Sequence, residues 1–198
     1  MTSMQRPNRR TVLKSSLAGA GALALGARRA AAQPSEVKIA LIVPLSGPWA
    51  RSGQLKKMGG DLAVKHINEQ GGIKALGGAK LRLISIDAGD NVEKAKNAAQ
   101  RLVSSEPDVV AGGGAWLSSF TLAVTEVTER ADLPWLTMAY ADQITARGYK
   151  NVFQTSLVSS AMVADAVPTA LNIAEKASGK RPSTVYVLRD NTAGPTAF

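Results

Sequence analysis

Few residues in this sequence of 198 residues could do chemistry, because it contains no cysteine and a single histidine, His66. Thiolate nucleophiles, thiolate metal sites and disulfides are thereby excluded, and a Ser–His–Asp triad finds little support. Asp87 and Asp90 lie at the end of a predicted strand and could bind Mg²⁺ or act as acid and base. The other interpretation is that Asp87 caps the next helix or binds loop backbone. We therefore predict no enzyme activity, no catalytic residue, no metal site and no cofactor.

A hydroxyl-rich stretch lies where a glycine run, residues 112–114, meets a predicted helix. It contains Trp116, Ser118 and Ser119. Backbone N–H groups at a helix start lack partners within the helix, and the helix dipole favours an anion there. Serine hydroxyls add further donors, so the stretch predicts a site for a carboxylate group. The alternatives are that Ser118 only caps the helix and that Trp116 belongs to the core.

Basic residues are concentrated at the N-terminus. The chain has 24 basic and 15 acidic residues and a formal net charge of +9, yet six of the basic residues and no acidic one lie in residues 1–32. The remainder mixes both signs and has no recognition motif, which argues against nucleic acid as a partner. Lys56 and Lys57 are predicted to lie on a solvated helix face.

Residues 1–32 have the three parts of an export signal. Arg9 and Arg10 precede an apolar run at 17–27, and three alanines end the segment at Ala32. The run is shorter than the ~20 residues that span a bilayer, and the paired arginines resemble a twin-arginine signal. We predict cleavage after Ala32 and a periplasmic location. The alternatives are the Sec pathway and an anchoring N-terminal helix.

Strand and helix patterns alternate after residue 36. Apolar stretches predict buried parallel strands at 37–43, 80–87, 108–111, 134–139 and 151–155. Helical periodicity predicts helices at 53–69, around 95–103 and at 120–131. This order predicts an α/β fold with an open parallel sheet and helices on both faces. Ligands bind such sheets at the carboxyl ends of the strands, which selects the loops 45–53, 88–91, 112–119 and 139–143.

The region after residue 155 begins a further unit. It is predicted to contain a helix at 160–176, a strand at 184–188 and a loop at 190–194. We expect residues 33–155 to form one ligand-binding lobe and residues 156–198 to start a second. The chain therefore looks like the front part of a longer protein.

Five motifs in order carry a family resemblance. They are Ile-Val-Pro-Leu-Ser-Gly-Pro at 42–48, Asn-Glu-Gln-Gly-Gly-Ile at 68–73, Asp-Ala-Gly-Asp at 87–90, the strand running into 112–119, and Ile-Thr-Ala-Arg-Gly-Tyr at 144–149. Together they resemble the leucine/isoleucine/valine-binding family of solute-binding proteins of bacterial ABC transporters. The resemblance implies a type I periplasmic-binding fold, whose two lobes close on an amino acid or related carboxylate, and membrane permease subunits as partners. The alternatives are a ligand-sensing domain of the same fold in a receptor and an exported enzyme.

The resemblance also implies ligand contacts. In the family a serine stretch, here 118–119, holds the carboxylate. The loop after the fourth strand, here 139–141, supplies a carbonyl and a hydroxyl to the amino group, although this chain lacks the threonine often found there. Ser52 stands where the family often has an aromatic residue, and Thr192 is the second-lobe candidate. The candidate contacts are Ser118, Ser119, Trp116, Ala139, Tyr140, Ala141, Ser52 and Thr192.

Aromatic residues fall in three of the four selected loops. Trp49, Trp116 and Tyr140 lie there, although the chain has only three Trp, three Tyr and three Phe. An aromatic-lined cleft suits a flat or bulky apolar acid better than valine or leucine. The alternative for Tyr140 is a surface position at the lip of the cleft.

Overall fold

The computed structural model describes residues 35–195, so the predicted export signal lies outside the described residues. Five parallel strands form one sheet in the order β2-β1-β3-β4-β5. The strands are β1 Glu36–Val43, β2 Lys80–Asp87, β3 Val109–Gly114, β4 Trp135–Thr137 and β5 Val152–Gln154. The predicted α/β class and parallel sheet are confirmed.

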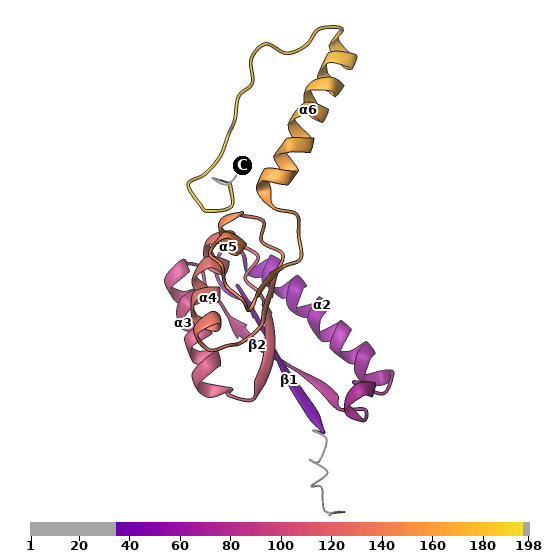
Figure 1. Cartoon of the computed structure of the whole chain (residues 1–198), viewed down its shortest axis with the longest axis vertical. Coiled ribbons are helices and arrows are strands. Elements are labelled where there is room, and N and C mark those ends of the chain that lie inside the picture. The colour runs from indigo at the N-terminus through magenta and orange to yellow at the C-terminus, as the bar shows by residue number, and fades with distance from the viewer. Residues whose placement is uncertain (1–34, 196–198) are drawn as a thin grey trace, which may run out of the picture. The chain divides into compact units, whose positions relative to one another are not determined.

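Helices separate the strands along the chain (Figure 1). They are α2 Ala50–Glu69, α3 Val92–Ser105, α4 Ser118–Arg130, α5 Gln143–Ala146 and α6 Ser159–Ser178, with a 3₁₀ turn at Lys74–Leu76. Among the residues from 35 to 195, no helix is long and apolar enough to cross a bilayer.

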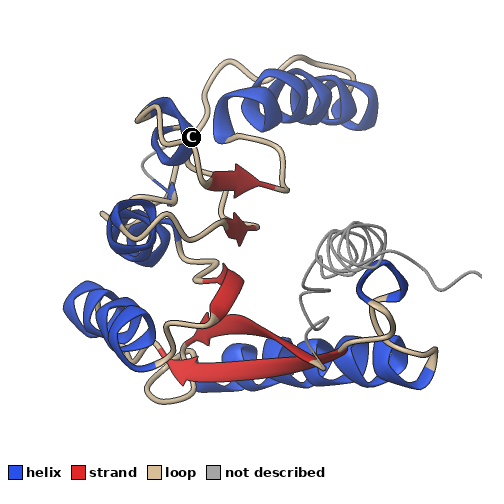
Figure 2. Cartoon of the chain, turned by 60° about the horizontal axis from the view of Figure 1, so that its bottom comes forward, coloured by secondary structure: helices blue, strands red, loops and turns tan. Residues whose placement is uncertain are grey.

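The helices lie on both faces of the sheet (Figure 2). The chain moves one way from β1 to β2 and the opposite way from β2 to β3, β4 and β5. Right-handed crossovers then place α2 on one face and the following helices on the other. Accordingly α2 packs on β1 and β2, whereas α3 and α4 pack against each other.

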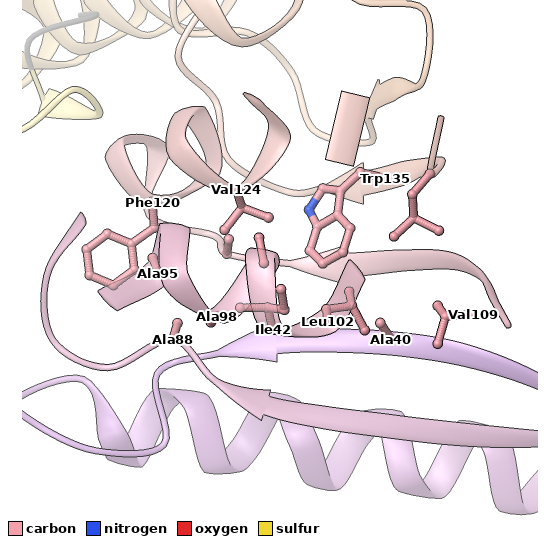
Figure 3. Close-up of a cluster of buried hydrophobic side chains, with 13 residues drawn as sticks. Ala40, Ile42, Ala88, Ala95, Ala98, Leu102, Val109, Phe120, Val124 and Trp135 are labelled. Carbon is pink, nitrogen blue, oxygen red and sulfur yellow. The ribbon is translucent and has the colours of Figure 1, made fainter. Parts of the chain in front are cut away.

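The main core lies between the sheet and the pair α3–α4. Fully buried Ile42, Leu102, Val124 and Trp135 fill it, together with buried alanines of α3 (Figure 3). In Figure 3 the ribbon of α2 runs on the opposite side of the strands from these side chains. The helical periodicity that predicts a helix around 95–103 therefore marks the buried stripe of α3.

Two elements, α2 and β3, are longer than predicted, because a turn hydrogen bond extends the helix and ladder pairing extends the strand. The helix α2 begins at Ala50, three residues early, because the Ala50 N–H already donates to Gly47 O at 3.1 Å. The strand β3 runs on through the glycines to Gly114, which pairs with Ile42 of β1. Ladder pairing extends this strand although glycine has a poor strand propensity.

The predicted strand at 184–188 is wrong. These residues are unpaired with any strand of the described chain, and the side chains of Val185, Tyr186, Val187 and Leu188 are exposed. A strand needs a neighbour to satisfy its backbone groups, and the five described strands all come from residues 36–154. The preceding helix α6 likewise buries only Ser159.

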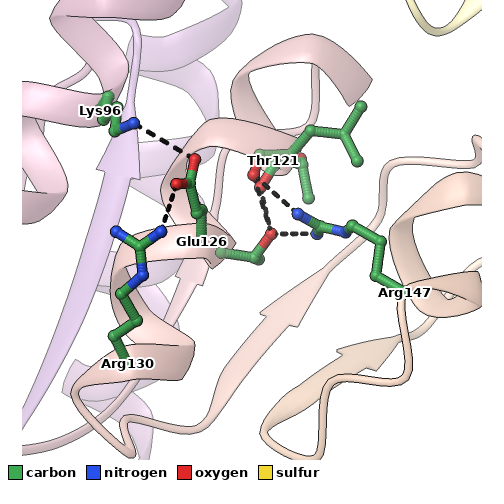
Figure 4. A network of polar contacts seen from close by, with 7 residues as sticks. Lys96, Thr121, Glu126, Arg130 and Arg147 are labelled. Atoms are coloured by element: carbon green, nitrogen blue, oxygen red, sulfur yellow. Dashed lines mark hydrogen bonds and ion pairs between the residues drawn. The ribbon is translucent and has the colours of Figure 1, made fainter.

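Polar contacts tie the helices beside the fourth strand together (Figure 4). Glu126 of α4 accepts from Lys96 of α3 at 3.2 Å and from Arg130 at 2.6 Å. Arg147, just after α5, donates to Leu122 O at 3.0 Å and to Thr125 Oγ1 at 2.5 Å. These bonds hold α5, and with it the loop that follows β4, against α4.

Thr128 offers a test of how this core is packed. Thr128 Oγ1 and Trp135 Nε1 are buried without a hydrogen-bond partner within the described part of the chain. Thr128→Val removes one unsatisfied group at nearly constant shape, so the free energy of unfolding in urea should rise by about 1 kcal/mol. Thr125→Val is the matched control and should destabilise, because Thr125 Oγ1 donates to Thr121 O at 2.5 Å. Equal destabilisation by both variants would contradict this description.

Candidate ligand-binding site

The carboxyl ends of β1, β3 and β4 meet at one edge of the sheet, where α2 and α4 leave toward opposite faces. This is the topological switch point at which open α/β sheets bind ligands. Ser118 is the first residue of α4, and Leu117 occupies the cap position without a side-chain cap bond. The alternative that Ser118 acts only as a helix cap is therefore wrong.

Ser118 joins two of the selected loops. Its side chain is 4% exposed, and its Oγ accepts the Ala141 N–H at 3.4 Å. Gly194 lies against the same place, because a methyl group built on it would stand 3.5 Å from Ser118 Oγ and 3.7 Å from the Tyr140 hydroxyl. The structure thus brings the loops 112–119, 139–143 and 190–194 together at the start of α4.

The remaining hydroxyl candidates are more exposed than Ser118. Ser52 is exposed in the first turn of α2, and Ser119 is partly buried next to Ser118. Thr192 is exposed, and both its N–H and its hydroxyl donate to Asp190 Oδ1, at 2.7 and 2.6 Å.

The carbonyl groups of residues 139–141 are already engaged. Ala139 O accepts from Gln154 Nε2 at 2.7 Å and from Ser156 Oγ at 3.0 Å. Tyr140 O accepts from the backbone N–H and the hydroxyl of Ser159, at 2.7 and 2.9 Å. The carbonyl of residue 141 accepts one backbone N–H, that of residue 144 in the following turn. These bonds fix the loop, and a ligand ammonium group could bind the Ala139 and Tyr140 carbonyls only in competition with their two existing donors each.

The two tryptophans of the loops have different partners. Trp49 packs edge-on against Phe120, with ring centroids 5.7 Å apart, and is partly buried against the main core. Its predicted place in an aromatic-lined cleft is therefore wrong. Trp116 is partly buried, and Lys56 Nζ lies 5.0 Å from the centroid of its ring.

A hollow of about 280 Å³ opens beside Trp116. Its lining includes Leu41, Lys56, Trp116, Leu136, Met138 and Thr155. Sequence reasoning missed Lys56 and Met138 here. The sequence spacing could have indicated Lys56. It follows the candidate residue Ser52 by four positions on a helix, so the two side chains lie on the same face of that helix.

Asp87 anchors the first loop. Its Oδ1 accepts from the N–H groups of Leu45 at 2.7 Å and Gly89 at 2.8 Å, and its Oδ2 accepts from Ser46 Oγ at 2.7 Å. Burial raises the pKa of Asp87, but these hydrogen bonds outweigh it, so the pKa lies below its ordinary value of 3.8. The loop-backbone interpretation of Asp87 is confirmed, whereas the cap of α3 is Asn91.

This anchor predicts a pH dependence. A pKa lower in the folded than in the unfolded chain gives stability that is fully present above 3.8 and is lost as the pH falls through the folded value. Asp87→Asn should therefore lower the free energy of unfolding at neutral pH and flatten its fall in acid. Urea titrations at pH values stepped down through 3.8 measure this. Ser46→Ala should act in the same direction more weakly, and an acid slope unchanged in Asp87→Asn would contradict the assignment.

Comparison with known proteins identifies the family. The family model for periplasmic binding proteins matches residues 36–198. This chain belongs to the periplasmic binding protein family. The resemblance found in the sequence is thereby confirmed, and the family and fold are those of solute-binding proteins.

Individual members of the periplasmic binding protein family show how far the likeness extends. Leu/Ile/Val-binding protein homolog 7 of Brucella abortus (strain 2308) is 36% identical over 138 residues, which are 68% of this chain and 33% of that protein. The leucine-binding protein LivK of Thermotoga maritima is 26% identical with a TM-score of 0.59, over 70% of this chain and 38% of LivK. The chain thus spans about a third of the length of this curated relative.

A further solved structure of similar fold holds an aromatic acid. A solute-binding protein of an ABC transporter from R. palustris, in complex with 4-hydroxybenzoate, is 26% identical with a TM-score of 0.57. The match covers 72% of this chain and 36% of that protein. Structures this similar in fold therefore include both a leucine-binding protein and a protein that holds an aromatic acid.

Proposed function

We propose that this chain is part of the solute-binding component of an ABC uptake system and captures a small amino acid or related carboxylate without transforming it. The observation that carries the proposal is the convergence of three loops on buried Ser118, at the first turn of α4. The solute's carboxylate lies at this helix start, where backbone N–H groups and the helix dipole favour an anion.

The relatives support the same function. The leucine-binding protein and the solute-binding protein compared above each match about 70% of this chain. The proposal includes a second lobe that starts near residue 156 and closes on the first, and permease subunits of the membrane as partners. It also includes export to the periplasm, with residues 1–32 acting as the signal and cleavage after Ala32.

Isothermal titration of the chain with leucine, isoleucine, valine and 4-hydroxybenzoate tests the proposal. We expect saturable binding of one equivalent of at least one solute, recovered chemically unchanged after incubation. Because this chain spans only part of the relatives' length, we expect affinity weaker than nanomolar. Turnover of a solute, or no heat from the whole panel at millimolar concentration, would overturn the proposed function.

A further inference from the structure

The hollow beside Trp116 straddles the switch point of the sheet. Leu41 and Lys56 reach it from β1 and α2, Trp116 from the loop after β3, and Met138 from the end of β4. Its volume of about 280 Å³ is near the lower end of the range for small-molecule sites. Except for one ammonium group and threonine hydroxyls, its side chains are apolar or aromatic.

Lys56 brings a positive charge into this apolar hollow. Its Nζ lies 5.0 Å from the centroid of the Trp116 ring, and the side chain is partly buried. Among residues 35–195 it forms no ion pair, whereas the neighbouring Lys57 binds Asp61 Oδ2 at 2.6 Å. The two adjacent lysines therefore differ. Lys57 is paired with an acidic residue of its own helix, whereas Lys56 remains available to a ligand.

No acidic side chain lines the hollow, and Lys56 is the one charged side chain among its described lining residues. The Ala139 and Tyr140 carbonyls each accept two hydrogen bonds. The carboxylate of Asp142 accepts from the hydroxyl and the backbone N–H of Ser160, and the carboxylate of Asp87 holds the first loop. Burying an ammonium group without a carboxylate partner is unfavourable, so a hollow lined by a lysine and by no acidic residue favours an anion over a zwitterion.

We propose that the hollow beside Trp116 binds the apolar body of a small organic acid that carries no ammonium group, and that Lys56 is the residue that selects it. Trp116 offers a flat surface for an aromatic or branched aliphatic body. Lys56, over the ring of Trp116 two residues before α4 begins, adds a positive charge to the helix start that attracts the carboxylate, and in this partly desolvated position a charge-assisted hydrogen bond is stronger than in water. The inference rests on the proposed function and narrows its substrate class.

Three ligands and two matched variants test this inference by isothermal titration of the full chain. The ligands are 4-hydroxybenzoate, 4-methylpentanoate and L-leucine, which has the carbon skeleton of 4-methylpentanoate plus an ammonium group. Both acids should bind more tightly than leucine. Lys56→Met should weaken their binding by about tenfold, because it deletes the ion pair and keeps the length of the side chain. Lys57→Met, the adjacent lysine, should change binding by less than about twofold.

The outcomes separate this inference from the proposed function. Tighter binding of leucine than of 4-methylpentanoate, or equal effects of Lys56→Met and Lys57→Met, overturns the inference and leaves the proposed function standing. Binding of none of the three ligands overturns the inference, and it overturns the proposed function as well when isoleucine and valine also fail to bind. Thermal melting of each variant confirms folding, and Lys56→Gln replaces Lys56→Met if the latter melts below the unmodified chain.

Discussion

Replacing Gly53 with alanine is expected to destabilise the chain by about 3 kcal/mol or more. A methyl group on Gly53 would stand 1.5 Å from Pro44 O and 2.6 Å from Pro44 C. Both are backbone atoms of the residue that directly follows β1, so they cannot move aside as a flexible side chain would. The first turn of α2 must shift away from the sheet, and the loop 45–53 of the candidate site must shift with it.

Gly59→Ala is the matched control for this variant. Gly59 lies in the middle of the same helix, and apart from the neighbouring backbone of that helix no atom lies within 4 Å of the built methyl group. Alanine there should stabilise the chain by about 0.5 to 1 kcal/mol, because glycine is a poor helix former. Urea unfolding measures both variants. Similar stabilities of Gly53→Ala and Gly59→Ala would show that α2 does not approach β1 as closely as described.

Replacing Ser118 with alanine should affect both stability and binding. The change removes the acceptor of the buried Ala141 N–H, so the free energy of unfolding should fall by about 1 to 2 kcal/mol. It also removes a donor at the start of α4, so the affinity for the solute should fall by about tenfold or more. Urea unfolding and calorimetric titration measure the two effects separately.

Ser159→Ala controls for the loss of a buried hydroxyl. Ser159 is fully buried, and its hydroxyl donates to Tyr140 O at 2.9 Å, in the same loop that Ser118 holds. It does not lie at the start of α4, so Ser159→Ala should lower stability with a smaller effect on affinity. An affinity that falls equally in both variants would mean that Ser118 acts only by positioning the loop.

Periodicity and composition were sufficient to predict the sheet. Buried parallel strands appear as apolar runs, and the stripe of Ala95, Ala98, Ala99 and Leu102 is fully buried as predicted. Strand ends then located the loops, because parallel strands present their carboxyl ends at one edge. The meeting of Ser118 with Ala141 follows from that rule.

Side-chain direction could not be predicted from the sequence. Trp49 lies in a selected loop but packs on Phe120, which is distant in the sequence, so only the folded chain shows that it belongs to the core. Residues 184–188 have a strand pattern but no neighbouring strand among the described residues. Lys56 and Lys57 are adjacent and identical in type, yet only Lys57 has an acid one helical turn away.

Intrinsic tryptophan fluorescence tests most directly whether the solute binds at the edge of the sheet beside Trp116. The chain has three tryptophans, of which Trp135 is fully buried and Trp49 packs on Phe120. Saturating solute should change the emission of the unmodified chain and of Trp49→Phe, and the change should be absent in Trp116→Phe. An undiminished change in Trp116→Phe would contradict binding at this edge.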